Sequence, residues 1–171
     1  LTYWMTEWNA WRNGLDAGKT TEYNYKFAGE CINYLFQLLK NGASAGIVWE
    51  GYDSFYEHPP SGWSLWGVLG YDKQSRTYYP RKHFYAISQI SKFVPPGSYH
   101  IATTDPGEGI ELLAFHDPVS GRVSVTGMNN TSYAVNIKGS FRDLPSIGHL
   151  EMFYTDSLRD LSGSDNISIT G

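Results

Sequence analysis

The stretch EYNYKFAGECINYLFQLLKNGASAGIVW, residues 22–49, decides the fold of the first half of this 171-residue chain. Its first part carries apolar residues at the spacing of an amphipathic helix with one buried face. These residues are Tyr23, Phe27, Cys31, Ile32, Leu35, Leu38 and Leu39. Asn41-Gly42 ends the helix, because glycine readily takes the left-handed conformation of a helix C-cap. The small apolar residues 43–49 then predict a short buried strand.

The residues before this helix predict another strand. Residues 1–6 are apolar nearly throughout, as in a sheet that is covered on both faces. Residues 9–21 contain two glycines and predict a loop, after which Thr20 or Thr21 caps the helix. Strand, helix and strand together form a βαβ unit, whose two strands are parallel.

The pattern changes after this unit. Residues 50–79 are rich in aromatic side chains but have little periodicity, which predicts a long ordered loop. Pro80 is expected in the first turn of a second helix, which ends at residues 95–97. The expected apolar face of this helix consists of Phe84, Ile87, Ile90 and Phe93.

From about residue 98 onward, apolar and polar residues alternate, which is typical of β-strands. The expected strands are Ile110–His116, Arg122–Gly127, Ser132–Lys138 and His149–Tyr154. A turn at residues 117–121 joins the first two strands into a hairpin. The chain is therefore expected to divide into an α/β part, residues 1–97, and an all-β part, residues 98–171.

The composition argues against several classes of function. A net charge of −4 does not suit a nucleic-acid-binding protein, which needs a basic surface. No apolar run is long enough to span a membrane. The single cysteine, Cys31, excludes an internal disulfide framework and is expected to be a buried thiol. The five histidines lack metal-ligand spacing, and most are expected at the surface or in turns, so no cofactor or metal is expected.

Two carboxylates follow the two predicted strands of the βαβ unit. Glu7 comes after the first strand among tryptophans, and Glu50 comes directly after the second. Neighbouring strands lie roughly 4.8 Å apart, catalytic groups gather at the carboxyl ends of barrel strands, and glycoside hydrolysis needs two carboxylates. An ionised Glu7 needs hydrogen-bond donors around it, and Arg12, Asn9 or tyrosines could serve. The alternatives are that Glu7 is an ordinary surface residue, and that Glu50 only binds sugar hydroxyls or holds the loop.

Three runs resemble glycoside hydrolases of clan A. Residues 3–8, YWMTEW, resemble the seventh barrel strand, which ends in the nucleophilic Glu, and residues 46–52, GIVWEGY, resemble the eighth. Residues 79–97, YPRKHFYAISQISKFVPPG, are similar to the last barrel helix and exit of glycoside hydrolase family 30. Trp8 departs from the smaller residues that are common after the nucleophile, which leaves the subfamily open.

The resemblance implies an α/β part and an all-β part: the last two βα units of a TIM (β/α)8 barrel, then an incomplete antiparallel β-sandwich. It implies a retaining glycosidase in which Glu7 forms a covalent glycosyl-enzyme, while the acid/base Glu lies outside this chain. The chain alone is then inactive, and its partners are a carbohydrate substrate and the N-terminal part of the barrel. Expected substrate contacts are Trp8, Trp49, Glu50, Tyr52, Trp63 and Trp66. A secreted or lysosomal setting fits this family.

Both ends of the chain interrupt strand-like runs, at Leu1 and at residues 166–171, which favours a fragment of a longer protein. Two other classes of protein stay open. One is a non-catalytic carbohydrate-binding or scaffold protein, although the aromatic residues concentrate in residues 3–85 rather than in the all-β part. The other is a lone α/β domain with an unrelated function, which would need a closed sheet of its own.

Overall fold

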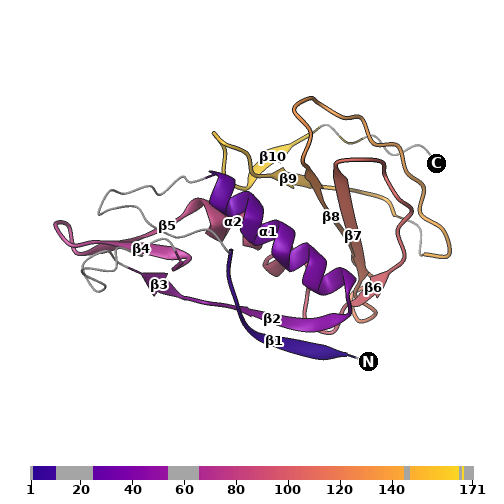
Figure 1. The fold of residues 1–171 in the computed structure, drawn as a ribbon. Coiled ribbons are helices and arrows are strands. Elements are labelled where there is room, and N and C mark those ends of the chain that lie inside the picture. The colour runs from indigo at the N-terminus through magenta and orange to yellow at the C-terminus, as the bar shows by residue number, and fades with distance from the viewer. Residues whose placement is uncertain (1, 11–24, 54–65, 145–146, 166, 168–171) are drawn as a thin grey trace. The chain divides into compact units, whose positions relative to one another are not determined.

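The computed structural model describes residues 2–10, 25–53, 66–144, 147–165 and 167 (Figure 1). The chain divides into two compact units: residues 1–88 with 155–161, and residues 89–154 with 162–171. Within the described residues, no helix has the length and apolar character needed to cross a membrane.

The predicted βαβ unit is present in the first compact unit (Figure 1). Strand β1 (Tyr3–Trp8), helix α1 (Tyr25–Lys40) and strand β2 (Ala43–Val48) follow one another, and the two strands pair in parallel. Gly42 has a φ of 90° and donates its N–H to the carbonyl oxygen of Leu39. A left-handed glycine thus ends α1, as predicted.

Helix α1 buries the predicted apolar face. Phe27, Cys31, Ile32, Leu35 and Leu38 are buried as expected, together with Ala28 and Phe36. In β2, a Cβ atom at Gly46 would lie 3.0 Å from Trp8 Nε1 and 3.4 Å from Leu35 Cδ1. The glycine therefore leaves the space in which Trp8 packs beneath the helix.

A small three-stranded sheet lies where the sequence predicts a long aromatic loop. Its strands are β3 (Tyr52–Asp53), β4 (Leu69–Asp72) and β5 (Thr77–Pro80). Strand β4 pairs in parallel with β3 and antiparallel with β5. The prediction of an unpaired loop over residues 50–79 is therefore wrong for the described part of that range.

A side-chain turn closes the β4–β5 hairpin. The Asp72 carboxylate accepts hydrogen bonds from the Gln74 N–H at 2.8 Å and the Ser75 hydroxyl at 2.7 Å. In β4, a Cβ atom at Gly70 would lie 2.3 Å from the ring of Tyr79. Only glycine leaves room for the Tyr79 ring at this position of β4. Because Gly70 has no side chain, the alternation of apolar and polar residues that predicts a strand is interrupted there.

The second helix, α2 (Lys82–Ser91), begins later than predicted and buries only part of the predicted apolar face, with Ile90 buried and Phe84 exposed. Pro80 pairs with Leu69 at the end of β5 and does not lie in the helix. The buried residues of this segment are Arg81, Lys82, His83, Ala86, Ser88 and Ile90. Phe84, which was predicted to be buried, is 36% exposed. The apolar spacing did not predict the whole buried face of α2, because charged residues occupy some of the buried positions next to specific partners.

Lys82 is a buried cation with three hydrogen-bond acceptors around its ammonium group. Its Nζ donates to the carbonyl oxygens of Asp156 and Arg159, at 2.9 and 3.4 Å. It also forms an ion pair of 2.6 Å with the Asp160 carboxylate. Lysine is almost never fully buried unless it is paired in this way. Lys82 thereby binds residues 155–161 to the rest of the first compact unit.

His83 is buried, unlike the surface position expected for most of the histidines. Its ring meets Phe27 edge-on, with the ring centroids 5.0 Å apart. Burial lowers the pKa of His83 to about 4, and the positive charge of Arg81 acts in the same direction. Backbone hydrogen bonds with Trp66 and Gly67 oppose this shift. His83 is therefore neutral at pH 7.

The low pKa of His83 predicts that acid destabilises the chain before its carboxylates are fully protonated. Between pH 6.5 and pH 4 the unfolded chain takes up a proton on this histidine that the folded chain does not bind. The free energy of unfolding should therefore fall by about 3 kcal/mol as the pH is lowered through that range.

Urea unfolding at pH 4.5 and pH 7 measures this loss. The His83→Phe variant cannot take up the proton, so its stability should depend less on pH than that of the natural chain. His149→Gln is the control, because the His149 side chain is 78% exposed. An equal pH dependence in the natural chain and in His83→Phe would contradict the prediction.

The second compact unit contains two antiparallel sheets. One has the order β6 (Tyr99–Ile101), β7 (Ile110–His116) and β8 (Val123–Asn129), and the other pairs β9 (Met152–Tyr154) with β10 (Ser162–Ser164). The predicted hairpin turn is confirmed: the Asp117 carboxylate accepts hydrogen bonds from the N–H groups of Val119 and Ser120.

The strand predicted at residues 132–138 does not form. The Asn129 side chain instead accepts a hydrogen bond from the Thr131 N–H at 2.9 Å and donates to the Tyr133 carbonyl oxygen at 2.8 Å. Such local side-chain bonds compete with the hydrogen bonds of a sheet. Strand β10, in contrast, was not predicted, because its sequence, Ser-Gly-Ser, has little preference for strands.

Candidate active site

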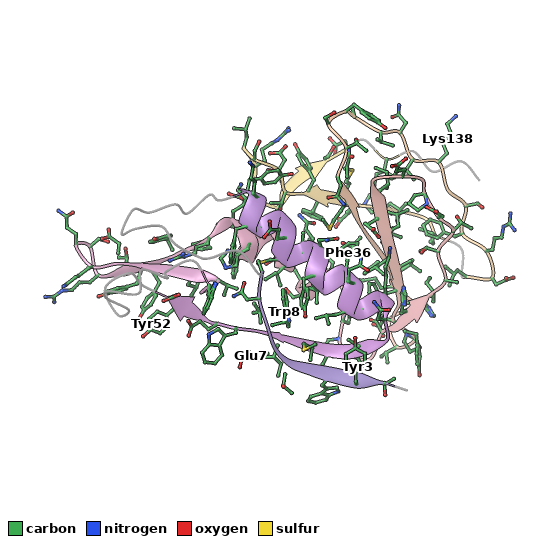
Figure 2. All side chains as sticks on the ribbon, in the orientation of Figure 1. Tyr3, Glu7, Trp8, Phe36, Tyr52 and Lys138 are labelled. Carbon is green, nitrogen blue, oxygen red and sulfur yellow. The ribbon has the colours of Figure 1, made fainter. Side chains whose placement is uncertain are left out.

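A bulge at the carboxyl end of β1 separates Glu7 from Trp8. Met5 pairs with Gly46 and Trp8 pairs with Val48, so β1 uses one more residue than β2 over this step. Bulges of this kind re-aim side chains and are frequent at barrel rims. Figure 2 shows the result, with Trp8 between β1 and α1 and Glu7 on the side of β1 away from the helix.

Glu7 is exposed on the face of the β1–β2 sheet that α1 does not cover, called here the open face. Side chains alternate across a strand, and Gly46 faces the helix, so Ile47 belongs to the open face. Trp4 pairs beside Ala45 on the same face. Trp4 and Ile47 are 68% and 53% exposed. Exposed apolar groups gathered in this way mark a surface that binds a partner or a ligand.

Trp8 has a packing role in this structure, which differs from the predicted substrate contact. It is 4% exposed, and its ring lies 6.0 Å from that of Tyr34 in α1. The bulge turns its side chain into the core, where a sugar cannot reach it.

The Trp49–Glu50 segment is held by backbone hydrogen bonds on both sides. The Trp49 N–H donates to the Trp8 carbonyl oxygen at 2.8 Å. The Glu50 N–H donates to the Trp66 carbonyl oxygen at 3.3 Å, and the Val68 N–H donates to the Glu50 carbonyl oxygen at 2.9 Å. The peptide bond between the two residues is cis. The Trp49 ring is nearly half exposed and Glu50 is half-buried, at the end of the strand beside Glu7.

The other predicted contacts lie in or near the small β3–β4–β5 sheet. Tyr52 is partly exposed, and its ring meets that of Tyr78 edge-on at 5.4 Å. Tyr71 approaches Tyr78 at 5.0 Å, so three tyrosines form one aromatic cluster. Trp66 is half-buried, and Trp63 lies outside the described residues.

The Asn9 side chain donates hydrogen bonds to two backbone carbonyl oxygens instead of to Glu7, its predicted partner. Its amide nitrogen donates to the carbonyl oxygen of Trp49 and, at 2.9 Å, to that of Trp66. An amide nitrogen has two hydrogens, so both are used. Arg12, the other expected donor, lies outside the described residues. Among the described residues, no group of three or more His, Cys, Asp or Glu side chains could hold a metal ion.

Comparisons with known proteins confirm the resemblance at the level of the fold. No family model matches the chain. The structure is similar to that of the endo-beta1,6-glucanase BT3312, with a TM-score of 0.56 and 23% sequence identity over 77% of this chain and 29% of that one. Also similar is the catalytic domain of GH30 xylanase C from Talaromyces cellulolyticus, with a TM-score of 0.47 and 19% identity over 68% of this chain and 25% of that one. The chain thus shares the fold of part of the glucanase structure. It spans less than a third of the length of either protein.

Proposed function

We propose that this chain is the C-terminal part of a retaining glycoside hydrolase of family 30 type. In this proposal residues 1–97 are the last two βα units of a (β/α)8 barrel, and residues 98–171 belong to a β-sandwich. The observation that carries the proposal is the open face: Glu7 projects from the bulged end of a parallel strand, beside the end of β2 and opposite the helix. In a (β/α)8 barrel the catalytic carboxylates lie at the carboxyl ends of the strands.

The proposed reaction uses Glu7 as the nucleophile. Its carboxylate attacks the anomeric carbon while an acid, supplied by a strand outside this chain, protonates the departing glycosidic oxygen. The covalent glycosyl ester is then hydrolysed by a water molecule that the same acid residue, now a base, deprotonates. Glu7 is released as a carboxylate, and the sugar keeps its anomeric configuration.

Two neighbours of Glu7 suit the binding of a sugar. The exposed indole of Trp49 offers a flat apolar face, and the half-buried Glu50 carboxylate can accept hydrogen bonds from sugar hydroxyls. We propose that both contact the substrate. The isolated chain should not hydrolyse it, because a barrel needs eight strands and loss of the acid/base group alone costs roughly 10²–10⁴-fold in rate.

The coding sequence upstream of Leu1 tests the proposal most directly. An open reading frame should encode further βα units there, with a strand that ends in Asn-Glu roughly 80–130 residues before Leu1, as three units of a barrel would require. That Glu would be the acid/base residue. A start codon directly before Leu1 would contradict the proposal.

A carbohydrate-binding protein without catalysis is the second candidate. The observation in its favour is the aromatic cluster of Tyr52, Tyr71 and Tyr78, which does not depend on Glu7 and in which Tyr52 and Tyr78 are exposed. Aromatic rings of this kind bind apolar faces of a ligand. A start codon directly before Leu1 would make this candidate the better one.

A further inference from the structure

We infer that Asn9 is a positioning residue, whose amide fixes the Trp49–Glu50 segment beside Glu7. This inference rests on the proposed function, because it assigns Asn9 a part in shaping the sugar site. It concerns a residue that touches neither the sugar nor the reacting atoms.

Four hydrogen bonds surround the Asn9 amide. The nitrogen donates to the carbonyl oxygens of Trp49 and Trp66. The oxygen accepts from the Ala10 N–H at 2.7 Å and from the Cys31 thiol, with the sulfur 3.4 Å away. The amide nitrogen therefore faces only hydrogen-bond acceptors, and the amide oxygen faces only hydrogen-bond donors.

These partners allow only one orientation of the amide. Rotating it by half a turn would bring its oxygen against two carbonyl oxygens and its N–H groups against the Ala10 N–H. Cys31 contributes to the choice, since it is fully buried and burial raises its pKa to about 12, which keeps the hydrogen on the sulfur. The Cys31 thiol thus supports the amide from the side of α1.

The Asn9 amide joins parts of the chain that are distant in sequence. Asn9 follows β1 two residues after Glu7, Trp49 follows β2, and Trp66 precedes β4. The Trp66 carbonyl oxygen also accepts the Glu50 N–H. One side chain therefore ties the strand that carries Glu7 to the carbonyl group of the Trp49–Glu50 peptide and to the Trp66 carbonyl oxygen, which accepts the N–H of the same peptide.

The expected effect of this tie is geometric. The position of a sugar that stacks on Trp49, relative to Glu7, depends on how the end of β2 is positioned relative to the end of β1. A displacement of about 1 Å in such a site can cost on the order of 10²-fold in rate. Asn9 should therefore matter for the geometry of the open end of the sheet more than for the stability of the fold.

Fluorine NMR of the 171-residue chain, produced with 5-fluorotryptophan, tests the inference. The variants Trp49→Phe and Trp4→Phe assign the two resonances of the open face. Asn9→Asp is nearly isosteric but replaces both donors by an acceptor that faces two carbonyl oxygens. Asn41→Asp is the matched control, because the Asn41 amide also donates to one carbonyl oxygen, that of Gln37, at an exposed site.

Asn9→Asp should shift the Trp49 resonance and abolish its single sharp line, while the Trp4 resonance stays in place. Cys31→Ala should change the Trp49 resonance in the same way but less, and Asn41→Asp should change neither. An unchanged Trp49 line in Asn9→Asp, or equal changes at Trp49 and Trp4, would overturn the inference. If Asn9→Asp does not fold, Cys31→Ala decides: a selective change at Trp49 supports the inference, and none overturns it.

The measurement needs no sugar and no turnover. A failure of the proposed function, such as a start codon directly before Leu1, would leave the fluorine spectra unaffected. The two hypotheses can therefore fail separately.

Discussion

Replacing Glu7 by Gln in a protein in which this chain completes the (β/α)8 barrel should lower kcat by on the order of 10⁴–10⁶-fold. Losses of this size follow the removal of a group that bonds covalently to the substrate. Glutamine keeps the size of the side chain but cannot form the glycosyl ester. Initial rates of sugar release from an aryl glycoside would measure the effect, and KM should change little because the amide still fits the site.

Two further variants make the Glu7 experiment specific. Glu108→Gln changes an exposed carboxylate of the second compact unit and should leave the rate unaltered. Glu7→Ala opens a space that azide can enter; attack by azide on an aryl glycoside would release the phenolate and give the glycosyl azide of inverted configuration. Near-normal activity of Glu7→Gln would rule out its role as nucleophile.

The Lys82→Met variant should lose about 3–5 kcal/mol of the free energy of unfolding, the usual cost of removing one partner of a buried ion pair. Methionine fills much of the same space, so the loss would come from the polar groups left behind. These are the Asp160 carboxylate and the carbonyl oxygens of Asp156 and Arg159. Residues 155–161 should then detach more easily from the rest of the first compact unit.

Urea unfolding followed by tryptophan fluorescence measures this loss, since all six tryptophans lie within residues 1–88. The control is Lys92→Met, because Lys92 is exposed and only approaches the rings of Phe93 and Phe153. That change should cost no more than about 1 kcal/mol. A double-mutant cycle with Asp160→Asn should show non-additive losses. A loss below about 1 kcal/mol in Lys82→Met would refute the structural role of Lys82.

The βαβ unit could be predicted because its signals are local and agree with one another. The 3.6-residue spacing in α1, the left-handed Gly42 and the small apolar residues of β2 all indicate the same arrangement. The hairpin of β7 and β8 was equally predictable, because alternation and the turn at Asp117 support each other. In each of these elements, the spacing of the apolar residues matches the repeat of the backbone structure.

Other elements depend on contacts that spacing does not reveal. The inward face of α2 could be predicted only in part: Ile90 is buried as expected, but Lys82 and His83 are buried among partners that are distant in sequence. The β4–β5 hairpin did leave one usable signal: Asp72 followed by polar residues is typical of a side-chain turn. It was obscured by the surrounding tyrosines.

The candidate site shows the same division. The positions of Glu7 and Glu50 at neighbouring strand ends could be predicted from the order of strands and helix. The β1 bulge could not be predicted, and it decides that Trp8 packs inward while Glu7 stays on the open face. The four bonds of Asn9 also escape a sequence reading, since they join residues up to 57 positions apart.

The single thiol has a practical consequence for spectroscopic work on this chain. Only the thiolate reacts with maleimides, and Cys31 is fully buried with its pKa raised to about 12. The natural chain should therefore not react with maleimides at neutral pH. A cysteine introduced at Val119, which is 94% exposed, would be the one reactive site for a dye or spin probe. Cys31 can stay in place, and with it the support it gives to Asn9.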